Sequence, residues 1–173
     1  TVDYIAAAVR PQDLAVLLYS SGTTGLPKPI GLSHENLRTN ALALSSDWGF
    51  GASDILLHTL PMYHIHGLLI SLNSVLLSAA NLIVMPNFSV EEVMQYLERA
   101  TVFMGVPTYY HRILNSPMLN KLDYSNIRLF ISGSAPLPEA ILERFQVSTG
   151  HTILERYGMT ETGVISSNPV SGE

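Results

Sequence analysis

Residues 20–28, with the sequence SSGTTGLPK, gather several groups that bind anions. Four hydroxyl side chains can donate hydrogen bonds to phosphate oxygens, and two glycines let the backbone approach an anion and direct N–H groups at it. Lys28 adds a mobile positive charge that suits a terminal phosphate. Taken alone, the same composition is equally typical of a polar turn between two strands.

Two prolines exclude a Walker A loop, in which the Gly-Lys pair opens a helix. Pro27 precedes Lys28 and Pro29 follows it, and residues 30–32 have the composition of a strand. The P-loop NTPase interpretation therefore fails on local geometry. Phosphate binding by the Gly- and Thr-rich loop remains open.

Three later segments add to this loop: residues 60–68 (LPMYHIHGL), 131–136 (ISGSAP) and 155–162 (ERYGMTET). Together with YSSGTTGLPK they resemble, in the same order along nearly the whole chain, the motifs of the adenylate-forming superfamily. That superfamily includes acyl-CoA synthetases, luciferases and the adenylation domains of peptide synthetases. The resemblance implies an enzyme that makes an acyl-adenylate from ATP and a carboxylate and then passes the acyl group to a thiol such as coenzyme A.

The resemblance also implies roles for single residues. Tyr157 would stack on adenine, Thr160 would donate to the α-phosphate, and Glu161 would bind Mg²⁺. Lys28, Thr160 and Glu161 would be the catalytic residues. Taken alone, Glu161 is as typical of a helix N-cap or a solvated carboxylate. The residues implied in nucleotide binding are Ser20, Ser21, Gly22, Thr23, Thr24, Gly25, Lys28, Gly133, Ser134, Ala135, Pro136, Glu155, Tyr157, Gly158 and Thr160.

Position 29 departs from the family pattern, because the family commonly has glycine where this chain has Pro29. Proline removes one backbone N–H and fixes φ, so we expect a stiffer loop with one phosphate contact fewer.

Two arginines indicate the class of acid. In relatives that activate aryl or fatty acids the position of Arg156 is typically small, so an arginine there would fill the pocket and need an anionic partner. A second carboxylate on the substrate is a natural partner. The pattern resembles the malonyl-CoA synthetases, which implies that Arg112 and Arg156 hold the distal carboxylate of malonate or methylmalonate, assisted by His64. Alternatively, Arg112 is a surface charge, and Arg156 pairs internally with Glu155 or another acid.

Other kinds of site have little support. His58, His64 and His66 lack the neighbouring cysteine or carboxylate that would complete a metal site. The chain has no cysteine and no GxSxG motif, which argues against a thiolate nucleophile, a disulfide framework and a serine hydrolase. Two functions stay open as alternatives: a synthetase for a medium-chain or aryl acid, and a truncated, non-catalytic nucleotide-binding module.

The elements that would position these residues alternate along the chain. Strand, helix and strand in alternation predict a mostly parallel sheet with helices on both faces and ligands at the carboxyl ends of the strands. We expect residues 67–85 to form a buried helix, a turn and a strand, and residues 166–173 to be turn-like. The expected strands are 14–19 (buried), 30–32, 55–60, 82–85, 102–104, 127–131 and 152–154. The expected helices are 33–47, 89–99, 107–114 and 138–150, with Ser89 and Glu92 forming a capping box.

The composition fits a compact domain. The chain has 173 residues, of which 47% are hydrophobic and only 13% are charged. The net charge of −5 is spread out, so we expect no nucleic-acid partner. Polar residues interrupt the apolar segment 67–85, so we expect no membrane span. No signal peptide is evident, and the cytoplasm or an organelle matrix is the expected compartment.

Two family elements are not found in the sequence: an aspartate in a TGD-type motif and a lysine on a small C-terminal domain. The only lysines are Lys28 and Lys121. We therefore expect residues 1–173 to be part of an adenylation domain without its C-terminal lid domain, with weak or no activity by themselves.

Overall fold

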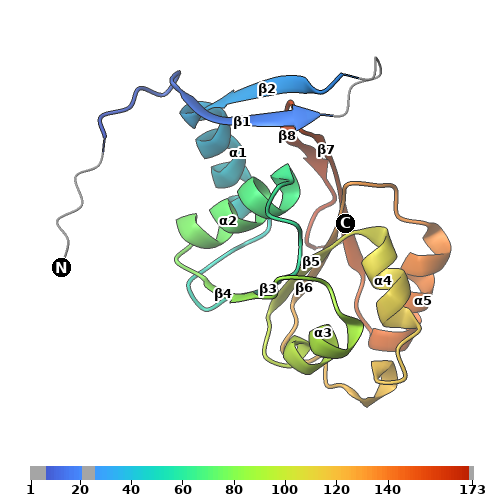
Figure 1. The fold of residues 1–173 in the computed structure, drawn as a ribbon. Helices are drawn as coiled ribbons and strands as arrows, with labels where there is room; N and C mark the ends of the chain where they lie inside the picture. Colours follow the sequence, from blue (N-terminus) through green and yellow to red (C-terminus); the bar gives the residue numbers. More distant parts are fainter. Residues whose placement is uncertain (1–6, 21–25, 172–173) are drawn as a thin grey trace.

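The computed structural model describes residues 7–20 and 26–171 (Figure 1). Within these residues, six strands form the main sheet in the order β4-β3-β5-β6-β7-β8. All neighbours in it are parallel except β7 and β8, which form an antiparallel hairpin. The expected, mostly parallel α/β sheet is confirmed. Its strands are β3 (Ile55–His58), β4 (Asn81–Val84), β5 (Val102–Gly105), β6 (Leu129–Ser132), β7 (Ile153–Met159) and β8 (Gly163–Ser167).

Helices cover both faces of this sheet, because successive strand residues point to opposite sides. Leu56 packs beneath the helices on one face, and Leu57 packs on the other. The first face carries α1 (His34–Asp47), the π-helical turn η1 (His66–Ser71) and α2 (Leu72–Leu77). The second face carries α3 (Val90–Leu97), α4 (Pro107–Leu114) and α5 (Glu139–Thr149). The short 3-10 turn η2 spans Leu119–Lys121.

The helix ends follow local sequence signals. The Ser33 side chain accepts a hydrogen bond from the Asn36 N–H at the start of α1, and Gly150 ends α5 with a φ of 76°. The predicted capping box at Ser89 is only half right. Ser89 accepts from the Glu92 N–H, but its hydroxyl donates to Glu91.

The first predicted strand differs from expectation in two ways. β1 (Leu14–Ser20) lies outside the main sheet and pairs antiparallel with β2 (Lys28–Ser33) as a hairpin above α1 (Figure 1). It is also not buried, because Leu14 and Tyr19 are 63% and 65% exposed. Its apolar run therefore predicted a strand correctly but placed it wrongly in the core.

Some boundaries were also wrong. β3 ends at His58 instead of Leu60. β7 runs on to Met159, so half of the ERYGMTET motif lies in a strand instead of a loop, and the supposedly turn-like Ser166 and Ser167 belong to β8. Residues 67–85 form helix, turn and strand as predicted. In the part of the chain that the structure describes, no helix is long and apolar enough to cross a membrane.

An ion pair lies at the amino ends of the parallel strands, opposite the ends that carry the motifs. Asp54, just before β3, accepts hydrogen bonds from Arg128 Nε and Nη2, both at 2.8 Å, and from Thr101 Oγ1 at 2.7 Å. Arg128 also donates to the Trp48 carbonyl at the end of α1. This network anchors one end of the sheet and leaves the carboxyl ends of β3, β6 and β7 to carry the candidate site.

Candidate functional site

A cavity of about 470 Å³ opens at the carboxyl ends of the parallel strands, and we call it the Arg156 cavity. It draws its walls from residues that are distant in sequence, since the segments that follow β3, β5, β6 and β7 meet at this edge. The polar side chains lining it are His64, His66, Tyr109, Ser134, Arg156 and Thr160.

Arg156 is the buried cation of this cavity, with 5% of its surface exposed. Its Nε and Nη2 atoms are buried and have no hydrogen-bond partner among the described residues. Glu155, the acid next to it, instead accepts a hydrogen bond of 2.8 Å from the Leu137 N–H. Burial lowers the pKa of Arg156 to about 10, so the side chain is still charged at neutral pH. A buried, unpaired guanidinium is the feature that an anionic ligand would satisfy.

Gly133 makes room for this guanidinium. A Cβ at that position would overlap Nε and Cζ of Arg156. The glycine after β6 therefore lets the Arg156 side chain lie flat against the backbone of the ISGSAP segment. The resemblance assigned Gly133 to the nucleotide, whereas in the structure its close contact is with Arg156.

His66 lies beside Arg156 at the start of η1. Its Nδ1 is 3.2 Å from the Ser134 hydroxyl, and Nε2 is buried without a partner in the described ranges. Burial, with the charge of Arg156 next, lowers the pKa of the His66 ring well below its usual range, and His58 and His64 add to the effect. His66 is therefore neutral at pH 7 in the structure.

The close packing of η1 against the preceding segment depends on one glycine. A side chain at Gly67 would overlap the Pro61 carbonyl, so only glycine allows the chain to fold back this tightly after the LPMYH segment. This packing fixes the buried position of His66, whereas His64 remains exposed at the cavity wall.

Arg112 is not brought together with Arg156 in the structure. It is exposed on α4, does not line the Arg156 cavity, and its guanidinium lies over the Phe88 ring with Cζ 4.8 Å from the centroid. It does lie one helical turn after Tyr109, which lines the cavity. Arg112 therefore stands near the mouth of the cavity and would have to reorient to reach a ligand there.

A second cavity of about 340 Å³ adjoins the first, and we call it the Tyr157 cavity. Tyr157 lines this cavity and is 59% exposed, and an aromatic ring there is suited to stack on a planar ligand. Ser134, Arg156 and Gly158 line both cavities and so form their common wall. The Tyr157 cavity brings together several residues predicted to bind the nucleotide, namely Ser134, Ala135, Pro136, Glu155, Tyr157 and Gly158.

The predicted phosphate loop lies only partly within the described residues. Ser21, Gly22, Thr23, Thr24 and Gly25 lie outside the described residues. Its two ends are described: Ser20 pairs with Lys28 across the β1–β2 hairpin. The loop therefore joins two antiparallel strands, and Lys28 is exposed at the start of the second one.

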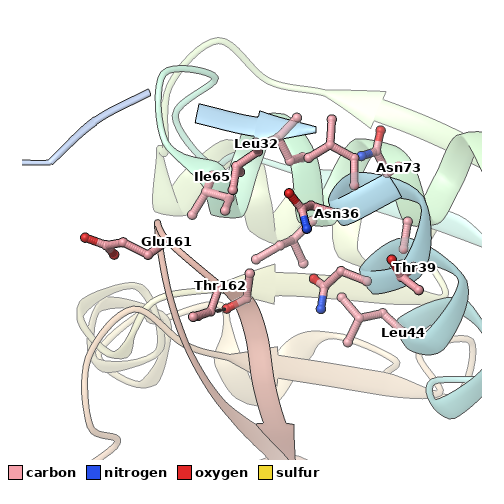
Figure 2. A pocket seen from close by; sticks show the side chains of 14 residues that line it. Leu32, Asn36, Thr39, Leu44, Ile65, Asn73, Glu161 and Thr162 are labelled. Atoms are coloured by element: carbon pink, nitrogen blue, oxygen red, sulfur yellow. Dashed lines mark hydrogen bonds between the residues drawn. The ribbon is translucent and has the colours of Figure 1, made fainter. Parts of the chain in front are cut away.

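Thr160 and Glu161 lie on the turn between β7 and β8. Thr160 lines the Arg156 cavity, whereas Glu161 is exposed and contributes to a third cavity beside α1, of about 340 Å³. Figure 2 shows the carboxylate of Glu161 directed away from this third cavity. The side chains of Asn36, Thr39 and Asn73 line the cavity itself. No group of three or more His, Asp or Glu side chains in the described ranges could hold a metal ion.

Some residues of the site escaped the sequence analysis. Tyr109 lines the Arg156 cavity but received no role in binding, and His66, which also lines it, was considered only for pocket lining or core packing. Residues 105–111 (GVPTYYH) and 64–66 (HIH) contained a signal for this position, because both place aromatic side chains shortly after a predicted strand. Which of the adjacent Tyr109 and Tyr110 faces the cavity depended on the rotation of α4 about its axis. Tyr109 lines the cavity, whereas Tyr110 is buried in the core and donates to the Ile131 carbonyl at 2.6 Å.

Comparison with known proteins agrees with this geometry. The mitochondrial malonate–CoA ligase of Homo sapiens is 39% identical over 91% of this chain, which covers 30% of that protein. The ATP-bound structure of MatB from Rhodopseudomonas palustris is 46% identical, with a TM-score of 0.94 over 98% of this chain and 34% of that one. A malonyl-CoA ligase in complex with methylmalonyl-CoA and AMP is 35% identical, with a TM-score of 0.90 over 98% of this chain and 38% of that one.

The chain thus spans about a third of the length of these relatives. The sequence model of the family described as "AMP-binding enzyme" matches residues 3–173, almost the whole chain. The likeness of the fold to the solved ligase structures agrees with that match. The chain belongs to the AMP-binding enzyme family.

Proposed function

We propose that this chain forms part of an adenylation domain in an ATP-dependent acid–CoA ligase that acts on malonate or a methylmalonate-like diacid. The observation that carries the proposal is Arg156, a buried guanidinium without a partner among the described residues, in the common wall of two cavities. The names of the relatives, malonate–CoA ligases and a ligase complexed with methylmalonyl-CoA and AMP, support the same substrate class.

The two cavities suit the two substrates of adenylation. The diacid would occupy the Arg156 cavity with its distal carboxylate on Arg156, and adenine would lie in the Tyr157 cavity against the Tyr157 ring. The reacting carboxylate and the α-phosphate would then meet near Thr160, whose hydroxyl would donate to a phosphate oxygen. Because this reaction is an in-line displacement at phosphorus, holding both partners in line is the main task of the protein.

The described residues fit Mg²⁺ only if the phosphates of the substrate supply some of its ligands. A site made of protein side chains alone has no support in the described residues, but Mg²⁺ is commonly bound by one or two carboxylates and substrate phosphates. We propose the exposed Glu161 as the carboxylate ligand, with Lys28 and the hydroxyls of residues 20–24 on the outer phosphates. When bound, the ion would neutralise negative charge on the phosphates.

The remaining steps belong to the whole protein. Coenzyme A would take the acyl group from the adenylate, and the cytoplasm or an organelle matrix would supply these soluble substrates. Arg112 is proposed as a second contact to the distal carboxylate after its side chain turns from Phe88 toward the cavity mouth.

The direct test is a screen of acids with the complete protein that carries this chain, with pyrophosphate release as the readout. We expect turnover with malonate and methylmalonate and little turnover with butyrate, a monoacid of similar length. A preference for butyrate, or for medium-chain or aryl acids, would replace the diacid with one of those substrates. Absence of turnover with every acid, despite measurable ATP binding, would instead favour a non-catalytic nucleotide-binding module.

A further inference from the structure

Asn40 joins α1 to the hairpin that carries Thr160 and Glu161. Its Nδ2 donates to the Val164 carbonyl at 2.9 Å, and the Val164 N–H donates back to its Oδ1 at 3.2 Å. Both backbone groups of Val164 are thus bonded by one side-chain amide. β8 is an edge strand of the main sheet, so Asn40 occupies the place that a further strand would otherwise take.

Gly163 makes this contact possible. It has a φ of +69°, a conformation that favours glycine, and a Cβ at this position would lie 2.8 Å from Cγ of Asn40. The same glycine therefore closes the β7–β8 turn and leaves room for the amide. The turn itself is tied back on Met159, whose N–H donates to Thr162 Oγ1 at 3.3 Å and whose carbonyl accepts from the Thr162 N–H at 3.2 Å.

α1 is also attached to the phosphate loop. β2 starts at Lys28 and leads through the Ser33 cap directly into α1. A second tether farther along the helix supports the first, since Trp48 Nε1 donates to the Ser167 hydroxyl of β8 at 3.0 Å. Within the described residues, α1 thus contacts both β2, the return strand of the loop, and β8, the strand after the Thr160–Glu161 turn.

We propose that Asn40 is a positioning residue: through Val164 it sets the place of Thr160 and Glu161 relative to Lys28 at the start of β2, and so determines how ATP and Mg²⁺ are held together. This inference rests on the proposed function only for the identity of the nucleotide. Sequence motifs do not include Asn40, and its side chain makes no hydrogen bond to Thr160 or Glu161; its partner is Val164.

Asn73 offers a matched control. It also lines the third cavity, but its side-chain amide makes no hydrogen bond to another described residue. Removing its amide therefore changes the polarity of the cavity without releasing β8. Gly163→Ala tests the same link from the other side, because the added methyl group would push the Asn40 amide away.

The experiment uses the complete protein that carries this chain and combines amide hydrogen exchange with calorimetric titration of ATP, with and without Mg²⁺. Asn40→Ala should speed exchange in residues 160–164 and weaken ATP·Mg²⁺ binding by about tenfold or more, since a small displacement of binding groups has large effects. ATP binding without Mg²⁺ should change less, because Glu161 then has no ion to bind. Asn40→Asp, which keeps only the acceptor, should have an intermediate effect, and Asn73→Ala should alter neither readout.

Two results would overturn the inference. Unchanged exchange in Asn40→Ala would mean that the amide does not hold β8, and faster exchange with unchanged ATP·Mg²⁺ affinity would reduce Asn40 to a structural role. The outcome is independent of the acid, because neither readout needs turnover. A protein that binds ATP·Mg²⁺ but adenylates no acid would therefore refute the proposed ligase activity and still decide the role of Asn40.

Discussion

Gly133 lies against the guanidinium of Arg156 so closely that even one methyl group at position 133 would overlap it. A glycine after β6 and an arginine in β7 therefore act as one unit. The glycine needs no positive φ here, so its absence of a side chain is what the site requires. Under the proposed function, this relationship would link the ISGSAP motif to the choice of acid as well as to the nucleotide.

The first prediction tests this contact. Gly133→Ala should displace Arg156 and raise the KM for malonate about tenfold to a hundredfold, since misplacing a binding group by about 1 Å has effects of that size. Steady-state kinetics of pyrophosphate release would measure it. Gly51→Ala is the matched control, because a Cβ there meets open space. An unchanged KM in Gly133→Ala would mean that Arg156 can shift without consequence.

The second prediction separates the two arginines. Arg112 is exposed, and solvent-exposed charge contacts contribute only about 0–1 kcal/mol. Arg112→Ala should therefore reduce kcat/KM for malonate by less than about tenfold. A loss in Arg112→Ala as large as that in Arg156→Ala would show that the proposed contact of Arg112 with the distal carboxylate is desolvated, and not solvent-exposed at the cavity mouth.

The third prediction concerns stability and pH. The pKa of His66 is lower in the folded chain than its ordinary value of 6.5, because burial and Arg156 disfavour its charged form. Below about pH 6.5 the unfolded chain therefore binds a proton that the folded chain does not. The free energy of unfolding therefore has its full value, as far as His66 is concerned, above that pH. It falls as the pH is lowered, by up to about 1.4 kcal/mol per pH unit for one histidine.

Urea unfolding between about pH 5 and pH 7.5 would measure this dependence. His66→Gln should reduce the slope of unfolding free energy against pH, although part should remain because burial also lowers the pKa of His58. His64→Gln, at an exposed position of the same segment, is the control and should change the slope less than His66→Gln, because the charge of His64 is the smallest of the causes that lower the pKa of His66. An identical slope in His66→Gln and the unmodified chain would contradict the buried, neutral ring.

The fourth prediction concerns the ion pair of Asp54 and Arg128 at the amino ends of the parallel strands. Burial opposes the charge of Asp54, but hydrogen bonds from Arg128, Thr101 and Gly51 prevail and lower the pKa of its carboxyl. Asp54→Ala should lower the free energy of unfolding by about 3 kcal/mol, since it leaves the Arg128 and Thr101 donors without their partner. Nucleotide affinity under stabilising conditions should not change. A loss of ATP binding at full folding would contradict the separation of this network from the site.

Local patterns predicted much of the fold. Ser33, Pro107 and Gly150 marked helix ends correctly, because capping depends on a few neighbouring residues. The apolar run of β1 could not reveal that its strand leaves the main sheet. Its partner is set by the return of the chain into β2, and exposure depends on what lies above the hairpin.

The site was predictable by residue type more than by arrangement. The motifs indicated Arg156, Tyr157 and Thr160, which the structure places at the two adjoining cavities. The partnership of Gly133 with Arg156 and of Asn40 with Val164 joins residues far apart in sequence. Such pairs depend on strand order and helix phase, which a single sequence leaves undetermined.

The most direct test of the central claim is the selectivity for malonate over butyrate, measured as the ratio of kcat/KM values in the complete protein with Arg156 and with Arg156→Ala. If Arg156 binds the second carboxylate, the substitution should lower this ratio by about a hundredfold, the size expected for a buried charge contact. A ratio that stays the same, even with slower turnover of both acids, would contradict the role of Arg156 in selecting a diacid.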